Sequence, residues 1–124
     1  MLRVLRSEYG GPRPSLLQRA RHRIGRYAVV RQYDQVDCGP AALLTVLRYW
    51  GGDDSLVHVR ELARTGARGS SLLDIVTAAS KLGFEAKGAA GEYDDLRQEP
   101  MPCIAHVIQE DNRLHYVVIF RIDE

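Results

Sequence analysis

The sequence predicts an α+β domain in which helices come first and antiparallel strands follow. Between residues 39 and 83, apolar residues recur with helical spacing, and three segments carry helix start and stop signals. From residue 84 onward the spacing of the apolar residues shortens to the two-residue period of strands. Two apolar segments flank the polar residues 110–113. This order of elements is typical of α+β domains, and 124 residues suffice for one of them.

The first helix is expected over residues 39–52. Pro40 suits a first helical turn, a stripe of leucines and valine follows it, and Gly51-Gly52 ends the segment. One face of this helix should therefore be buried.

Two further helices are expected over residues 55–64 and 70–83. The second helix starts at a capping Ser55, and the third begins with the capping-box spacing of Ser71 and Asp74. The second half then supplies a short strand from residue 84, a helical turn over 93–98, and a hairpin formed by residues 102–109 and 114–122.

The N-terminal segment differs from the rest in charge. Residues 1–31 contain eight arginines and one acid, whereas residues 32–124 contain nine basic and fifteen acidic side chains. We expect residues 1–27 to be a solvated or frayed basic extension, followed by an extended segment over 26–34, and residues 28–124 to be the domain. Nucleic acid is ranked low as a partner, because no aromatic residues are interleaved with the arginines for stacking.

The cysteine and apolar content narrows the class of protein. Cys38 and Cys103 lie 65 residues apart, match no zinc spacing and follow no secretory signal, so neither a disulfide framework nor a metal site is expected. No apolar run approaches the roughly 18 residues of a membrane span. We expect a soluble chain in a reducing compartment, without a cofactor; Cys103 has the pattern of a core residue.

Cys38 is the residue that calls for an explanation. A free cysteine is most often a small buried hydrophobe. With Pro40 in the first helical turn, however, Cys38 sits at or next to a helix N-terminus, where unpaired N–H groups and the helix dipole favour a thiolate. A thiolate is the nucleophile of a cysteine enzyme. Asp37 does not help form it and is expected to be a cap or a surface contact.

A nucleophilic cysteine needs a base and an oxyanion stabiliser. His22 lies in the basic extension and His58 on a polar helix, so both are expected to face solvent. His106 and His115 lie on the two arms of the hairpin; His115 is preferred because it opens its strand near an edge, and His106 stays open as the alternative. Gln32, an amide donor just upstream of the helix, is the candidate oxyanion donor.

Taken together, these residues resemble the peptidase domains of bacteriocin-processing ABC transporters, papain-like cysteine endopeptidases that cut after a Gly-Gly pair. The family pattern of a glutamine and then Asp-Cys-Gly, with the cysteine six residues after the glutamine, matches Gln32, Asp37, Cys38 and Gly39. The segments "AALLTVLRYWGG", "GSSLLDIVTAASKLGF" and "MPCIAHVI…LHYVVIF" follow the family's order of landmarks. The resemblance covers roughly residues 30–122.

The resemblance implies a papain-like fold and a role for each matched residue. Cys38 would be the nucleophile, His115 the general base and acid, and Gln32 an oxyanion-hole donor together with the backbone N–H of Cys38. His106 would be a non-catalytic landmark. The implied partners are a precursor with a double-glycine leader and the membrane and ATPase parts of a transporter, at the cytoplasmic face of the membrane.

The sequence departs from the family in its third catalytic residue. The family has an aspartate, usually before a proline, well after the histidine strand, whereas this sequence ends nine residues after His115. The domain is therefore expected to lack that segment, and Asp123 is a poor substitute. Loss of the third group lowers turnover by about 10⁴ in the serine analogue, and less is expected for a Cys–His pair.

Two functions follow as hypotheses. The first is a cysteine endopeptidase that removes double-glycine leaders, coupled to export. The second is a peptidase-like module of weak or absent activity that holds a leader peptide or docks on a transporter. Gln32, Cys38 and His115 favour the first; the missing carboxylate favours the second.

Overall fold

The helices and strands follow the predicted order, with one strand added at the N-terminus. The computed structural model describes residues 2–9, 35–99, 101–108 and 114–123. Among these residues the elements are, in chain order, β1 (Leu2–Tyr9), the short 3-10 turn η1 (Gln35–Asp37), α2 (Cys38–Tyr49), α3 (Leu56–Leu62), α4 (Leu72–Lys81), β2 (Phe84–Gly91), α5 (Tyr93–Leu96), β3 (Cys103–Ile108) and β4 (Leu114–Ile119). The α+β prediction is confirmed.

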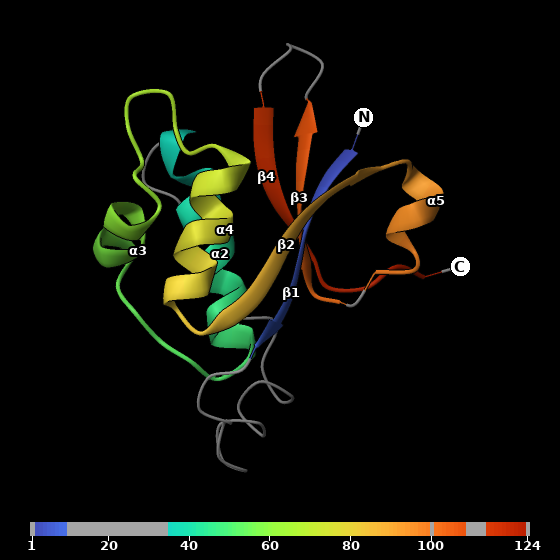
Figure 1. Cartoon of the computed structure of the whole chain (residues 1–124), viewed down its shortest axis with the longest axis horizontal. Helices are drawn as coiled ribbons and strands as arrows, with labels where there is room; N and C mark the ends of the chain where they lie inside the picture. Colours follow the sequence, from blue (N-terminus) through green and yellow to red (C-terminus); the bar gives the residue numbers. More distant parts are fainter. Residues whose placement is uncertain (1, 10–34, 100, 109–113, 124) are drawn as a thin grey trace.

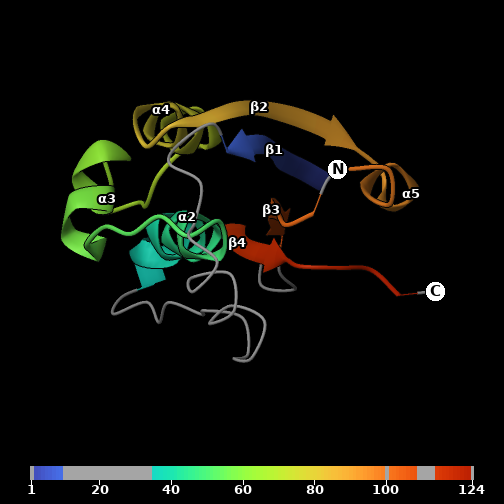
Figure 2. The same cartoon turned by 90° about the horizontal axis from the view of Figure 1, so that it is seen from below.

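The strands form one antiparallel sheet in the order β2-β1-β3-β4. The predicted hairpin is present as β3 and β4, in which His106 lies opposite Tyr116 and Val107 opposite His115. Figures 1 and 2 show α2, α3 and α4 gathered at one side of the sheet, with α5 at the far end from them. Within the described strands, β4 is therefore an edge strand that lies beside α2.

The main core lies between the helices and the sheet. α2 packs on β4, and α4 packs on β2, so the apolar stripe of each helix is removed from water. The largest fully buried side chains of this core are Leu43, Leu44, Val46, Val59, Ile75 and Ile104. A second, smaller cluster of Leu96 and Cys103 forms near α5, and the expectation that Cys103 is a core residue is confirmed.

The helix starts are held by the caps that the sequence predicts. The Ser55 hydroxyl accepts a hydrogen bond from the His58 N–H at the start of α3. At the start of α4 the Asp74 N–H donates to the Ser71 hydroxyl and the Ser71 N–H donates to the Asp74 carboxylate, both at 3.1 Å. None of the helices in the described part of the chain is long and apolar enough to span a bilayer.

The N-terminal residues differ from the frayed extension that the sequence predicts. Residues 2–9 form β1, which pairs with β2 from Leu2 opposite Gly91 to Tyr9 opposite Phe84, and with β3 at residues 3–5. Pairing on both sides satisfies backbone groups that a frayed end would leave to water. The predicted extended segment 26–34 lies outside the described residues, and the domain boundary at residue 28 stays a prediction.

Candidate active site

Cys38 is the first residue of α2, which begins one residue before the predicted helix, so Cys38 lies next to the N-cap as expected. Asp37 occupies the N-cap position, and Cys38 is buried, with 9% of its surface exposed. The first turn of a helix carries N–H groups without intrahelical partners, which can donate to a negatively charged oxygen. Such a position suits a sulfur nucleophile and an oxyanion beside it.

Gly39 allows α2 to approach β4 and α4 closely. A Cβ atom at this position would lie 2.8 Å from Cδ1 of Ile75 and 3.2 Å from Cδ2 of Tyr116. A larger residue would therefore require the Ile75 side chain to shift and the Tyr116 ring to move by a few tenths of an ångström. Gly39 therefore has a packing role: its lack of a side chain lets the N-terminus of α2 lie against β4.

His115 is the second residue of β4 and is partly buried. α2 and β4 begin at the same end of the molecule (Figure 1), and they lie side by side (Figure 2). The fold thus brings the elements that carry Cys38 and His115 together. Among the described residues no hydrogen bond joins the two side chains, an arrangement common in cysteine and serine enzymes without substrate.

His106, the alternative base, is held in the core. Its ring is stacked on that of Tyr116, with ring centroids 4.1 Å apart and an angle of 8° between the planes. The Tyr116 hydroxyl in turn donates a 2.9 Å hydrogen bond to the Ser70 carbonyl oxygen, which ties β4 to the loop before α4. The sequence reasoning assigned no role to Tyr116, although its position beside His115 could have signalled one.

Asp37 stands at the N-cap position, but the expectation that its side chain caps the helix or makes a surface contact is wrong. Its side chain is fully buried, makes no capping hydrogen bond, and lies with Oδ1 2.9 Å from Nε of Arg60 on α3. The backbone of Asp37 adopts a helical conformation, with φ −88° and ψ 0°, whereas a capping residue is usually extended. The carboxylate is consequently turned toward α3.

The other candidates have simpler surroundings. His58 is exposed, as predicted, and its Nδ1 lies 2.7 Å from the Asp54 carboxylate. Asp123 is exposed and pairs with Arg121 at 2.9 Å. Gln32 and His22 lie outside the described residues. In the described ranges no three His, Cys, Asp or Glu side chains are grouped as metal ligands.

Cys103 has the environment of an unreactive thiol. Burial, and secondarily the negative charge of Glu99, raise the pKa of Cys103 from 9.0 to about 11. A thiol with so high a pKa stays protonated at neutral pH, and only the thiolate is a strong nucleophile. This environment leaves Cys38 as the candidate nucleophile of the two cysteines.

Comparison with known sequences gives a family. The Peptidase C39 family model matches residues 26–124. The pediocin PA-1 transport/processing ATP-binding protein PedD of Pediococcus acidilactici is 40% identical over 95 residues, which are 75% of this chain and 13% of the relative. The chain therefore spans only about an eighth of the length of that relative.

Two solved structures have the same fold. The peptidase domain of Streptococcus ComA, a bifunctional ABC transporter of a quorum-sensing pathway, superposes with a TM-score of 0.73 and 37% identity, over 80% of this chain and 74% of that one. A double-glycine-motif protease from an AMS/PCAT transporter, in complex with the leader peptide, superposes with a TM-score of 0.70 and 32% identity. The match covers 80% of this chain and 69% of that one. Sequence and fold thus agree with the resemblance drawn from the motifs, and the chain belongs to the Peptidase C39 family.

Proposed function

We infer that the chain is a cysteine endopeptidase that removes double-glycine leader peptides from bacteriocin-type precursors. The observation that carries this proposal is the position of Cys38 at the first residue of α2, beside the strand that carries His115, in a member of the Peptidase C39 family. The solved relative bound to a leader peptide and the pediocin-processing relative support the substrate class.

The reaction is an acyl transfer to sulfur followed by hydrolysis. His115 takes the proton of the Cys38 thiol, and the sulfur attacks the carbonyl carbon of the second glycine. The developing oxyanion accepts hydrogen bonds from the Gln32 amide and the Cys38 backbone N–H. His115 then protonates the leaving amine as the peptide bond breaks, and water releases the leader from the thioester.

Export supplies the cellular context of the proposal. Because the chain covers only 13% of its curated relative PedD, the partners we propose are the membrane and ATPase parts of an ABC transporter. The peptidase would then act at the cytoplasmic face of the membrane, where its precursor is made. A helical leader would be held in a groove remote from the sulfur, by the apolar face of the helix.

One observation favours a second candidate function. Asp123 is 70% exposed and paired with Arg121, so it does not supply the carboxylate that would orient the His115 imidazole. A peptidase-like module in which no carboxylate orients the histidine can hold a leader peptide without cutting it. A precursor-binding module is therefore the alternative.

A cleavage assay separates the two functions. A synthetic double-glycine precursor is mixed with the parent chain, Cys38→Ala and His115→Ala; binding is followed by fluorescence anisotropy and products by mass spectrometry. The endopeptidase predicts a product shortened after the second glycine from the parent only, with binding by all three. Binding by the parent and by Cys38→Ala without any shortened product would contradict the endopeptidase and support the precursor-binding module.

A second measurement needs no substrate. The rate of Cys38 alkylation is measured by peptide mass spectrometry as a function of pH, with Cys103 as internal reference and His58→Ala as matched control for His115→Ala. An assembled Cys–His pair predicts labelling that persists below the pH of about 8.5 at which a free thiol ionises, and that is lost only in His115→Ala. Labelling unaffected by the His115 substitution would contradict the pair.

A further inference from the structure

The residue directly before the nucleophile is a buried carboxylate that the proposed reaction does not use. Asp37 has 0% of its surface exposed, although aspartate is rarely buried unless it is paired. It stands at the N-cap of α2, where an aspartate ordinarily accepts hydrogen bonds from the first helical N–H groups, but its side chain makes no such bond. Capping therefore does not explain why Asp37 is buried.

Arg60 supplies the only charge partner of Asp37 among the described residues. Its Nε lies 2.9 Å from Oδ1 of Asp37, within ion-pair distance. This contact does not meet the geometry of a hydrogen bond, and within the described part of the chain neither carboxylate oxygen of Asp37 has a hydrogen-bond partner. Burying an ionised carboxylate is unfavourable without a partner, so the Arg60 guanidinium is what allows this carboxylate to stay in place.

The ion pair has two consequences for the sulfur. It ties the turn η1, which ends at Asp37, to α3, and thereby fixes the first turn of α2, to which Cys38 belongs. It also offsets a negative charge one residue from the sulfur, and an unpaired carboxylate there would oppose formation of a thiolate. We propose that Asp37 and Arg60 are a positioning pair for Cys38, an inference that rests on the proposed function.

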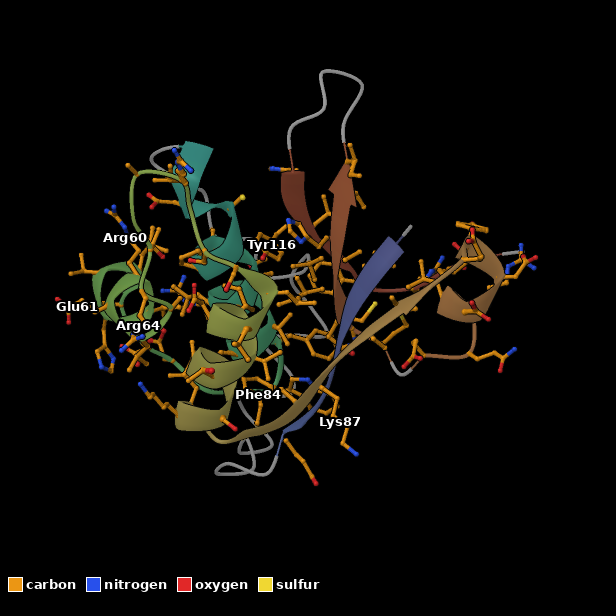
Figure 3. The ribbon with its side chains drawn as sticks, turned by 45° about the horizontal axis from the view of Figure 1, so that its top comes forward. Arg60, Glu61, Arg64, Phe84, Lys87 and Tyr116 are labelled. Atoms are coloured by element: carbon orange, nitrogen blue, oxygen red, sulfur yellow. The ribbon has the colours of Figure 1, made fainter. Side chains whose placement is uncertain are left out.

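Arg60 also connects this pair to the surface. Its side chain is 42% exposed and lines a hollow of about 250 Å³ on α3, together with Val57, Glu61, Arg64 and Thr65. Figure 3 shows Arg60, Glu61 and Arg64 together at α3. Arg64 lines the same hollow and has no ion-pair partner among the described residues, so it is a matched control for Arg60.

The test measures Cys38 alkylation at one fixed pH, with precursor cleavage as a second readout. In Arg60→Gln the carboxylate of Asp37, one residue before Cys38, is left buried and without its charge partner. We expect alkylation and kcat to fall about 10- to 100-fold with KM unchanged, the size that a displaced reacting group produces. Arg64→Gln should have the same alkylation rate and the same kcat as the parent. Arg60→Lys, which keeps the charge, should recover part of the loss.

The double variant Asp37→Asn/Arg60→Gln gives the sharpest outcome. Removing the carboxylate removes the unpaired charge, so the double variant should react faster than Arg60→Gln alone. Circular dichroism and thermal unfolding check the fold of each variant. Equal loss in Arg60→Gln and Arg64→Gln, or Arg60→Gln with the alkylation rate of the parent, would overturn the inference. A parent that alkylates rapidly but cleaves no precursor would instead contradict the proposed function.

Discussion

The rings of His106 and Tyr116 lie flat against each other across the β3–β4 hairpin, with their centroids 4.1 Å apart. The Tyr116 ring also lies against Gly39 at the start of α2, so the stacked pair packs against the helix that carries Cys38. His106 is thereby part of the packing beneath the candidate site. Its imidazole contributes a stacked ring to that packing and is not used in the proposed reaction.

This arrangement predicts that His106→Phe keeps the fold and the cleavage. Phenylalanine has a similar volume and preserves the ring stacked on Tyr116, so the variant should remain folded. His115→Phe should fold equally well and lose cleavage. Thermal unfolding and the precursor assay on both variants make the comparison; a folded His106→Phe without activity would transfer the role of base to His106.

The contact between Gly39 and Tyr116 predicts a strong effect of one added methyl group. In Gly39→Ala the new Cβ would overlap Cδ1 of Ile75 and press on the Tyr116 ring. We expect a loss of about 1–3 kcal/mol in the free energy of unfolding, as in other overpacked cores, and slower alkylation of Cys38.

Gly66→Ala is the control for that variant, because a Cβ at Gly66 would meet nothing within 4 Å. It should change the free energy of unfolding by less than about 0.5 kcal/mol, as ordinary surface substitutions do. Urea denaturation of the two variants and the parent measures both values. Equal stability of Gly39→Ala and Gly66→Ala would show that the start of α2 has room to move.

The raised pKa of Cys103 predicts a loss of stability at alkaline pH. The folded chain keeps the thiol proton until pH about 11, whereas the unfolded chain gives it up near pH 9.0. Between these values the folded state binds more protons than the unfolded state. The contribution of the Cys103 thiol to the free energy of unfolding is therefore complete below pH 9.0 and declines as the pH rises toward 11. The decline should be roughly 1 kcal/mol per pH unit.

Unfolding free energies of the parent and of Cys103→Ala, measured from pH 8 upward, isolate this contribution. The variant lacks the thiol, so its stability should fall less steeply over the same range, while other groups titrate equally in both chains. Parallel curves would mean that the thiol is not shielded as the structure indicates.

The central position of β1 predicts different outcomes for proline at two leucines. Leu5 pairs with Gly88 on one side and with Ile104 on the other, so Leu5→Pro removes a backbone donor inside the sheet and should unfold the domain. Leu2 is the first residue of the strand and pairs only with β2, so Leu2→Pro should be tolerated. Circular dichroism of the two variants decides; if Leu5→Pro is folded, β1 is not part of the stable sheet.

The elements that local signals define were predicted correctly. Ser55, Ser71 and Asp74 begin their helices as expected, because caps depend on residues three positions apart. Gly83 ends the α4 segment with a φ of 100°, which favours glycine. Cys38 could be placed at a helix start for the same reason, since Pro40 is only two residues away.

The features that were missed depend on partners distant in sequence. β1 was interpreted as part of a basic arm because its strand partners lie some 75 to 100 residues further on. The burial of Asp37 could not be foreseen, since Arg60 stands on another helix. Tyr116 was passed over because its contacts with Gly39 and Ser70 join three separate elements. Gln32 lies outside the described residues and stays a prediction.

The place of β1 in the sheet also bears on how the domain matures during translation. Residues 2–9 are synthesised well before the two strands that flank them in the sheet, Phe84–Gly91 and Cys103–Ile108. At about 5–20 residues per second, the N-terminal strand waits roughly 4 to 15 seconds for its first neighbour. The helices α2, α3 and α4 can assemble during that interval, but β1 gains both of its neighbours only after Cys103–Ile108 has been made.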